Sequence, residues 1–576
     1  MYTRIRPRRK RRRAGRHFFV FFLLGLFAVV GWYIYLNYIP NNKIVKPDYP
    51  FKHTIMVEGQ AAAEGATLRN GEILLPVDVL NEALGPDKPI YYEPDTGSIV
   101  MTTSDKVLRL RTESLTATIN SKPYQLTVAA EVEDGIVYVP ATPLKELYGI
   151  DAEYAEQTGI VTLLRAGKAI QLAETKSEEG ASIRLGASIR EPIVEQVPAG
   201  GVIRVWDSGN GWLFVQGPSG NPGYIASKDV TLTAEDVPEE PESNDSFVPW
   251  DAKDGPINLT WEAVYNRNPD PAGIPKMEGV NVVSPTWFEL QDGKGTVKGK
   301  ADPAYVRWAH SQGMQVWAVF SNGFEPERTT KALASADTRF YMIQQLVAFA
   351  ELYKLQGINI DFENVHTSDK QNLVQFVKEL TPLLHEQGLV VSIDVTPKST
   401  SEMWSLFLDR AALGKTVDYM MLMAYDEHWA SSPTAGSVAS LGWTEQSLLR
   451  ILEEDGVPPE KLILGMPLYT RIWTETKDES GAVKVTSKAV GMEQVRSIIA
   501  EKKLKPAYDA DSGQNYVEYK EGNALNRIWI EDEVSIKARV ALARKYGLAG
   551  VATWQRGFQA DDIWKTIQEA LQGQTK

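Results

Sequence analysis

Three polar side chains alternate along one short apolar segment of the chain, residues 355–365, and two of them are carboxylates. The β-branched and aromatic residues of this segment predict a strand, with Gly357 near its start. Successive side chains of a strand point to opposite faces, so Asn359, Asp361 and Glu363 share one face and the intervening apolar residues share the other. Charged side chains are almost never fully buried unless they are paired. We therefore interpret the row as a site in which carboxylates transfer protons or stabilise charge.

The composition of the chain excludes several kinds of catalytic and binding site. The 576 residues include no cysteine, which excludes disulfides, thiolate catalysis and cysteine-ligated metal. The six histidines are scattered without ligand-like spacing, so we predict no metal site. Nine basic residues lie within residues 1–16, and the remainder carries a formal charge of −22 against −13 for the whole chain. An acidic body of this kind predicts no nucleic-acid partner.

The elements that must hold the row follow a repeated strand-then-helix pattern after about residue 252. Apolar residues at spacings of three and four, as in Leu373, Phe376, Leu380 and Leu383, predict the helices. Eight such strands favour a (β/α)8 TIM barrel with its site at the C-terminal ends of the strands. The alternative, a doubly wound open sheet, would normally carry a glycine-rich phosphate loop, and the sequence has none. The predicted strands are 257–265, 279–284, 315–320, 357–363, 389–395, 418–425, 461–467 and 547–553.

Polar and aromatic residues collect at the ends of these strands. One such residue would mean little, but this many at corresponding positions is the expected layout of a barrel active site. The residues are Trp287, Asn322, Glu363, Tyr425, Asp426, Glu427, Tyr469, Arg471 and Trp554.

Four ordered motifs on the predicted strands resemble those of the family 18 glycoside hydrolases. They are Gly357-Ile-Asn-Ile-Asp-Phe-Glu363, Met423-Ala-Tyr-Asp426, Gly465-Met-Pro-Leu-Tyr-Thr-Arg471 and Gly550-Val-Ala-Thr-Trp554. The resemblance covers residues 252–572, with a small insertion at about 475–540 before the last strand. The segment 418–429 is similar to the bacterial branch of the family that acts on peptidoglycan or spore cortex.

The resemblance implies a role for each residue of the site. Glu363 would be the proton donor, Asp361 would orient the substrate's 2-acetamido group, and the Tyr425 phenol would hold its carbonyl oxygen. The 2-acetamido oxygen would attack the anomeric carbon, a substrate-assisted retaining reaction that needs no metal or cofactor. The residues expected to bind substrate are Asn359, Asp426, Trp554, Tyr469, Arg471 and Trp287.

Two features of the row leave alternatives open. Positions two apart on a strand are about 6.7 Å apart, between the carboxyl separations of retaining and inverting pairs, so spacing alone does not fix the stereochemistry. The sequence also departs from the family motif at two acids, which are replaced by Gln356 and Asn359. Their loss bears on the pKa values of the row, whereas Asp361 and Glu363 remain.

A run of 19 uncharged residues, 18–36, follows the basic segment 1–17. As a helix it is about 28 Å long, enough to span a bilayer, and aromatic residues crowd its far end. The positive-inside rule places residues 1–17 in the cytoplasm and the rest outside. The rival, a cleaved signal peptide, would need a small-residue cleavage site after the run, and we find none. We predict a single-pass protein of the bacterial cell membrane, anchored through residues 18–36.

Between the anchor and the barrel we predict two small domains and a linker. Residues 53–172 contain a repeat with an offset of 64, in which Gly71-Glu-Ile-Leu-Leu-Pro76 matches Gly135-Ile-Val-Tyr-Val-Pro140. They resemble the amino-terminal module of copper amine oxidases, which we interpret as a structural α+β spacer. Residues 178–233 resemble bacterial SH3-like β-barrels, which often bind cell-wall peptides. Their Trp206, Trp212 and Tyr224 have two alternative explanations that fit equally well, an aromatic binding groove and packing in the core. The acidic residues 234–251 read as an extended linker.

The sequence thus predicts a multidomain, membrane-anchored hydrolase of β-1,4 bonds at N-acetylglucosamine in cell-wall glycan. Peptidoglycan and chitin remain alternatives, as do cleavage at chain ends and in chain interiors. A catalytically silent, sugar-binding barrel is the first rival, although such relatives usually lack the acid that Glu363 provides here. A membrane scaffold whose small domains carry the function is the second.

Overall fold

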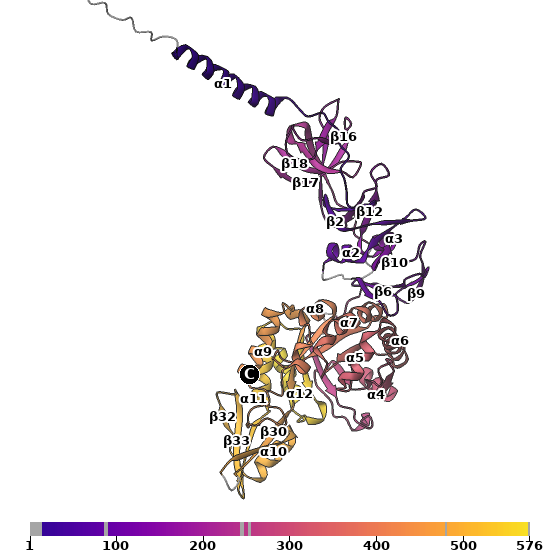
Figure 1. Ribbon diagram of the computed structural model, residues 1–576. Helices are drawn as coiled ribbons and strands as arrows, with labels where there is room; N and C mark the ends of the chain where they lie inside the picture. Colours follow the sequence, from indigo (N-terminus) through magenta and orange to yellow (C-terminus); the bar gives the residue numbers. More distant parts are fainter. Residues whose placement is uncertain (1–13, 86–89, 242–246, 251–254, 478–480, 574–576) are drawn as a thin grey trace, which may run out of the picture. The chain divides into compact units, whose positions relative to one another are not determined.

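The computed structural model describes residues 14–85, 90–241, 247–250, 255–477 and 481–573 (Figure 1). The chain forms two compact units. The first comprises Met1–Ile90, Arg111–Ala117 and Gln125–Glu242, and the second comprises Tyr91–Leu110, Thr118–Tyr124 and Ser243–Lys576. The basic residues 1–13 of the predicted cytoplasmic tail lie outside the described residues.

A closed parallel barrel forms the centre of the second unit. Its strands run in the order β22-β21-β35-β29-β28-β27-β26-β25, and pairing of β22 with β25 closes the ring. Every predicted barrel strand is present, so the TIM barrel expected from the sequence is confirmed. The strands are β21 (Ile257–Glu262), β22 (Val282–Pro285), β25 (Gln315–Ser321), β26 (Gly357–Asp361), β27 (Val390–Val395), β28 (Tyr419–Met423), β29 (Leu462–Pro467) and β35 (Gly550–Trp554).

Three of these strands end earlier than the sequence pattern predicts. β21 ends at Glu262, β26 at Asp361 and β28 at Met423, so Glu363 and Tyr425 lie in the loops that follow their strands. Beyond the rim of a barrel a strand has no neighbouring backbone with which to continue its ladder of hydrogen bonds. The chemistry-bearing side chains are therefore presented from loops at the C-terminal end of the barrel.

Helices surround the barrel, and two apolar layers hold it together. Ile358 and Ile360 of β26 point outward and are fully buried in the cluster between strands and helices. A second cluster, which includes Trp261, Trp317 and Met421, fills the barrel interior. The helices are α4 (Pro303–Ser311), α5 (Pro326–Ala334), α6 (Ala336–Tyr353), α7 (Lys370–His385), α8 (Arg410–Thr416), α9 (Leu441–Glu454), α11 (Glu533–Lys545) and α12 (Ile563–Leu571).

The insertion before the last barrel strand is a separate small sheet with one helix. It begins at Tyr469, earlier than the predicted residue 475. Its last strand ends at Ile530, earlier than the predicted residue 540, because the next element, helix α11, packs on the barrel and not on the inserted sheet. Its strands run in the order β31-β30-β34-β33-β32 around a small apolar core. The elements are β30 (Tyr469–Lys477), β31 (Val483–Gly491), α10 (Met492–Glu501), β32 (Ala507–Asp509), β33 (Gln514–Glu521) and β34 (Ala524–Ile530).

Part of the predicted repeat module belongs to the same compact unit as the barrel. The Glu93 carboxylate accepts a hydrogen bond from the backbone N–H of Ala336 (2.8 Å) at the start of α6. Arg109 donates to the Ala336 carbonyl (3.0 Å), pairs with Asp337 (3.2 Å) and lies over the Phe340 ring. Residues 91–110 are therefore part of the compact unit that contains the barrel. They belong to the sheet β5 (Ile90–Glu93), β6 (Ser98–Thr102), β7 (Val107–Arg111), β8 (Thr116–Ile119) and β9 (Lys122–Gln125).

The rest of the repeat lies in the first unit, where its two copies pair with each other. Equivalent strands β4 and β11 are antiparallel neighbours, with Leu75 opposite Val139, and helices α2 (Val77–Leu84) and α3 (Ala141–Tyr148) each begin after a proline. One sheet contains β3 (Thr67–Arg69), β4 (Glu72–Pro76), β10 (Glu131–Glu133) and β11 (Ile136–Pro140). The other contains β1 (Thr54–Val57), β2 (Gln60–Gly65), β12 (Ile150–Tyr154) and β13 (Val161–Arg165).

The segment predicted to be SH3-like is a seven-stranded, antiparallel β domain around its own core. The partly buried Trp206 ring lies so close to Gly59 of the repeat that a Cβ atom there would come within 2.8 Å of it. Packing therefore occupies one side chain of the predicted aromatic groove, and the SH3-like resemblance stays a prediction. The strands are β14 (Ile170–Thr175), β15 (Ala181–Arg184), β16 (Ile193–Val197), β17 (Val202–Gly209), β18 (Trp212–Gln216), β19 (Pro222–Ala226) and β20 (Val230–Asp236).

The two ends of this first unit correspond to the predicted linker and the predicted membrane anchor. The linker begins later than expected, because Glu235 and Asp236 pair with β14, and its residues 242–246 and 251 lie outside the described residues. Near the N-terminus, helix α1 (Ala14–Tyr38) contains a 22-residue stretch with a mean hydropathy of 2.3. The helix is long and apolar enough to cross a membrane.

Candidate functional site

The row predicted from the sequence lies inside the barrel, and Asn359 is its deepest member. Asn359 is fully buried. Its Oδ1 accepts hydrogen bonds from Trp261 Nε1 (3.1 Å) and Ser284 Oγ (3.2 Å), and its Nδ2 donates to Asp394 Oδ1 (2.9 Å). The prediction that Asn359 contacts substrate is therefore wrong, because its amide is buried and engaged within the protein. It fixes the side chains around the row.

Glu363 is held in place through its own backbone. The side chain of Asn322, which follows β25, accepts from the Glu363 N–H (3.1 Å) and donates to the Glu363 carbonyl (2.8 Å). Asn322 is buried and also donates to Thr329 Oγ1 (3.0 Å), so the clamp is itself fixed. The Glu363 side chain is left partly exposed at the mouth of the barrel.

Burial shifts the protonation of both carboxyls of the row in the same direction but to different extents. Burial raises the pKa of Asp361 from the usual 3.8 to about 6. Burial, with the charges of Asp361 and Asp426 added, raises the pKa of Glu363 well above its ordinary value. A pair whose environments push the two pKa values apart can provide one acid and one base at the same pH. Glu363 is the group that keeps its proton, and Asp361 is the group that ionises.

The sequence prediction missed a third carboxyl, Asp394 on the neighbouring strand β27. It is buried, and the pKa of its carboxyl is raised well above the ordinary value, chiefly by burial and next by the charge of Asp361. The polar residues Ser392 and Asp394 alternate with apolar ones along β27 as the row does along β26. This alternation is the signal in the sequence that pointed to a second polar strand in the barrel interior.

Four residues predicted from the sequence meet between the end of β28 and strand β30. Tyr469 Oη donates to Asp426 Oδ1 (2.6 Å), and Arg471 Nη2 donates to the same oxygen (3.2 Å). The Tyr425 and Tyr469 rings are 6.4 Å apart between centroids. Tyr469 and Arg471 are themselves buried, and both hold the Asp426 carboxylate in place.

Tyr425 is a partly exposed phenol in an acidic setting. Burial, followed by the charges of Asp394 and Glu363, raises its pKa well above 10. The phenol therefore keeps its proton throughout the physiological range and can act as a hydrogen-bond donor.

The two tryptophans predicted at the strand ends lie in different environments. Trp554, the last residue of β35, is partly exposed and packs against the interior cluster, 6.1 Å from Trp261 between ring centroids. Trp287 is fully buried in the outer cluster, where its Nε1 donates to Asn268 (2.6 Å) and its ring meets Tyr305 edge-on. The prediction that Trp287 binds substrate is wrong, because its ring has no exposed surface.

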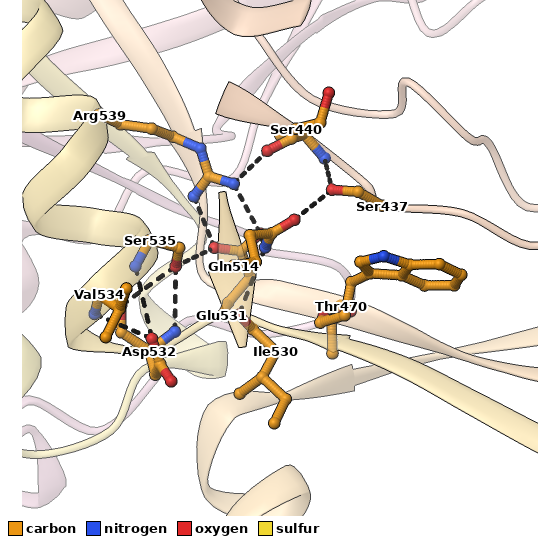
Figure 2. A network of polar contacts seen from close by, with 12 residues as sticks. Ser437, Ser440, Thr470, Gln514, Ile530, Glu531, Asp532, Val534, Ser535 and Arg539 are labelled. Atoms are coloured by element: carbon orange, nitrogen blue, oxygen red, sulfur yellow. Dashed lines mark hydrogen bonds and ion pairs between the residues drawn. The ribbon is translucent and has the colours of Figure 1, made fainter. Parts of the chain in front are cut away.

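A buried ionic network anchors the loop that follows β28 and carries Asp426 (Figure 2). Arg539 of α11 pairs with Glu531 through two hydrogen bonds (2.5 and 2.9 Å) and donates to the Ala439 carbonyl. Gln514 of β33 donates to Glu531 (2.8 Å) and accepts from Ser437 Oγ. The network therefore links the inserted sheet, helix α11 and the site loop through hydrogen bonds and an ion pair.

We expect Glu531→Gln to destabilise the second unit by about 3 kcal/mol, because the buried Arg539 guanidinium would lose its neutralising charge. The exposed Glu533, which pairs with Lys537 at 3.1 Å, supplies the control Glu533→Gln, for which we expect less than about 0.5 kcal/mol. Urea unfolding measures both. Equal midpoints for the two variants would contradict this role of the network.

In the part of the chain that the structure describes, no group of three or more His, Cys, Asp or Glu side chains is arranged to hold a metal ion.

Gln356, which replaces one of the two family acids, lies away from the residues proposed to do the chemistry. The Gln356 Oε1 accepts from the backbone of Val316 and its Nε2 donates to the Lys354 carbonyl, at the N-terminal end of β26. Replacement at Gln356 therefore concerns how the strand starts, not the site.

Two family models match parts of this chain. Residues 289–559 match the family model of glycosyl hydrolases family 18, and residues 56–163 match that of the copper amine oxidase N-terminal domain. The solved C-terminal domain of a putative chitinase from Desulfitobacterium hafniense DCB-2 is 25% identical to this chain. Its TM-score is 0.49, over 56% of this chain and 99% of that domain.

Curated relatives are distant and align with half of this chain or less. The uncharacterized glycosylase YvbX of Bacillus subtilis (strain 168) is 28% identical over 304 residues, 50% of this chain and 84% of that protein. The cortical fragment-lytic enzyme of the same organism is 26% identical over 232 residues, 40% of this chain and 52% of that enzyme. The match covers 64% of the cortical fragment-lytic enzyme of Bacillus anthracis, so this chain spans about half to two thirds of those enzymes. The enzyme class predicted from the sequence is confirmed by the match of residues 289–559 to the family model of glycosyl hydrolases family 18.

Proposed function

We propose that this chain hydrolyses β-1,4 glycosidic bonds at N-acetylglucosamine in peptidoglycan or chitin-like glycan, with retention of anomeric configuration. The observation that carries the proposal is the geometry at the mouth of the barrel, where Asn322 fixes the backbone of Glu363 and, among the described residues, the nearby Asp361 Oδ1 has no hydrogen-bond partner. Glu363 keeps its proton while Asp361, two residues away, ionises at about pH 6. An acid and an anion so placed fit a glycosidic bond and the acetamido group beside it.

The first half of the reaction breaks the glycosidic bond. Glu363 gives its proton to the glycosidic oxygen as the bond from that oxygen to the anomeric carbon breaks. The substrate's 2-acetamido oxygen forms the new bond to the anomeric carbon from the opposite face, which gives a cyclic cationic intermediate. The Asp361 carboxylate accepts a hydrogen bond from the acetamido N–H and stabilises the positive charge that develops on the nitrogen. Among the described residues, the buried Asp361 Oδ1 has no hydrogen-bond partner, which leaves an acceptor for this N–H.

The second half of the reaction opens the intermediate with water. The Glu363 carboxylate takes a proton from the water as the water oxygen attacks the anomeric carbon. The bond between the anomeric carbon and the acetamido oxygen breaks, which releases the acetamido group. The Tyr425 phenol donates to the acetamido oxygen and so holds it in line. Asp426, fixed by Tyr469 and Arg471, adds a second polar group at the same rim. Trp554 offers an apolar surface to the sugar ring.

Exposed aromatic side chains near the strand ends support binding of a polymer. Phe324, two residues beyond Asn322, and Trp404 are 51% and 43% exposed, and their rings lie 6.1 Å apart. Asn364, next to Glu363, donates to the Phe324 carbonyl (2.9 Å), which ties this pair to the catalytic loop. Trp429 in the loop after β28 is 53% exposed. Aromatic faces at such positions suit the apolar faces of sugars.

The choice of glycan and the cellular location are part of the proposal. The cortical fragment-lytic enzymes among the relatives fit a peptidoglycan substrate, and the di-N-acetylchitobiases among them fit a chitin-like one. Helix α1 would anchor the chain in the cell membrane with the barrel on the outer side, facing the wall. The β domain of residues 170–236 would contact cell-wall peptide.

The full chain, purified in detergent, should release reducing ends from glycan strands of peptidoglycan, and product masses would identify the bond cleaved. Chitin oligomers assayed beside peptidoglycan decide between the two substrate classes. Tight glycan binding without any product from either substrate would favour the sugar-binding barrel and contradict the proposed hydrolase.

A further inference from the structure

Two asparagine side chains connect the loop that follows β25 to the loop that follows β26. Asn322 is buried in the first loop, and Asn364 lies in the second, directly after Glu363. The Asn322 Oδ1 accepts hydrogen bonds from two backbone N–H groups, those of Glu363 (3.1 Å) and Phe324 (3.3 Å). The Asn322 Nδ2 donates to the Glu363 carbonyl (2.8 Å), and the Asn364 Nδ2 donates to the Phe324 carbonyl (2.9 Å). All four backbone polar groups of Glu363 and Phe324 are therefore bonded to these two side chains, which we call the asparagine pair.

The two loops contain backbone conformations that most side chains seldom adopt. The φ angle is +62° at Phe324 and +55° at Asn364, in the left-handed region. Asparagine tolerates this region, whereas a bulky side chain such as that of Phe324 is strained there and persists only where the surrounding contacts determine the conformation. Because the hydrogen bonds of the asparagine pair supply such contacts, the conformation of both loops depends on these two side chains.

The segment after Glu363 is also tied to the loop that carries Trp404. The Val365 N–H donates to the Met403 carbonyl (3.1 Å). Phe324 and Trp404 form an exposed pair of rings 6.1 Å apart between centroids. Sugar faces pack on aromatic faces, so a glycan on these rings would be bound by residues that share their hydrogen bonds with the acid. The position of the acid relative to such a glycan therefore depends on the asparagine pair.

We propose that Asn322 and Asn364 are positioning residues for Glu363. By holding the backbone of Glu363 and that of Phe324, they set the direction from which the acid reaches the glycosidic oxygen. Proton transfer requires the donor within hydrogen-bond reach of that oxygen, and a displacement of about 1 Å is enough to slow a reaction by about 10²-fold. The inference rests on the proposed function, because it takes Glu363 as the proton donor.

The leaving group of the substrate separates a role in positioning the acid from a general effect on the fold. A sugar hydroxyl departs only with a proton from Glu363, whereas a dinitrophenolate departs without one. In the full chain, Asn322→Ala should therefore lower kcat/KM by about 10²-fold on an N-acetylglucosamine oligomer and by less than about threefold on the dinitrophenyl glycoside of the same oligomer. Equal losses on the two substrates, in a protein that unfolds cooperatively on heating, would overturn the inference. No loss on either substrate would also overturn it.

Asn364→Gly tests the same role at a partly exposed position, so the result does not depend on whether the buried variant folds. Glycine adopts a positive φ without strain, so this variant loses the bond to the Phe324 carbonyl and keeps the backbone conformation accessible. We expect kcat/KM to fall about three- to tenfold on the oligomer and less than about twofold on the dinitrophenyl glycoside.

Asn70→Gly is the matched control for Asn364→Gly. Asn70 is exposed, has a φ of +51° in the turn between β3 and β4, and has no role in the site. The control should leave kcat/KM unchanged on both substrates. An Asn364→Gly protein that cleaves the oligomer as fast as the control would overturn the role of Asn364.

Hydrogen exchange followed by mass spectrometry distinguishes failure of this inference from failure of the proposed hydrolase. The N–H groups of Glu363 and Phe324 both lose their acceptor in Asn322→Ala, so these amides should exchange about tenfold faster or more than in the unaltered chain. Unchanged exchange would overturn the inference even if the unaltered chain cleaves glycan. If the unaltered chain cleaves neither substrate, the proposed hydrolase fails, and faster exchange would still support the hold of the asparagine pair on Glu363.

Discussion

Replacement of Glu363 with glutamine is expected to lower kcat by about 10²- to 10⁴-fold, with KM close to that of the unaltered protein. Glutamine has nearly the same shape as the protonated glutamic acid, so glycan binding should survive. It has no proton to give to the glycosidic oxygen and cannot take one from water afterwards. Asn322 holds only the backbone of Glu363, so its clamp should persist in the variant.

Steady-state release of reducing ends, with thermal unfolding of each protein, measures this prediction. Glu402→Gln is the matched control, because Glu402 is an exposed glutamate in the segment after β27 and no role in the site is assigned to it. We expect the control to keep full activity. A Glu363→Gln protein that is folded and releases product as fast as the control would remove Glu363 from the mechanism.

Replacement of Asp361 with asparagine should have opposite effects on activity and on stability. Activity should fall by about 10²-fold or more, because a neutral amide cannot stabilise the charge on the acetamido nitrogen. The stability effect follows from the pKa, which burial raises from 3.8 to about 6. The folded state binds this proton more tightly than the unfolded state. The corresponding stability is therefore fully present below about pH 4 and is lost as the pH rises to about 6.

Near neutral pH the ionised Asp361 thus lowers stability, and asparagine should recover on the order of 2–3 kcal/mol. At about pH 4 the two proteins should be nearly equal, because Asp361 is then protonated. Urea unfolding at both pH values measures the difference, and the pH profile of kcat/KM for the unaltered protein should show its acidic limb near pH 6. A stability difference that does not change with pH would contradict the raised pKa.

Much of the barrel could be predicted because local patterns agreed with the final packing. Strand β26 has isoleucines on one face, which are buried under the helices, and polar residues on the other, which line the interior. That alternation fixed both the strand and the direction of Asp361. The ends of strands were harder to predict, since the chain composition does not change at Glu363 or Tyr425 and only the lack of a neighbouring backbone ends the ladder.

The candidate site was predicted only where a side chain's position along a strand decides its role. Glu363, Asp361 and Tyr425 follow from strand position, and the structure brings them together. Trp287 was misassigned because a tryptophan after a strand can turn toward the mouth or toward the helices, and packing against Tyr305 decides that. Asp394 was missed because its significance depends on the strand pairing that places it next to Asp361.

The anomeric configuration of the first product, followed by proton NMR before mutarotation sets in, tests the central chemical claim most directly. With Glu363 as the acid and the substrate's own amide as the nucleophile, the new reducing end must appear as the β-anomer. Initial formation of the α-anomer would mean direct attack by water and would contradict the account.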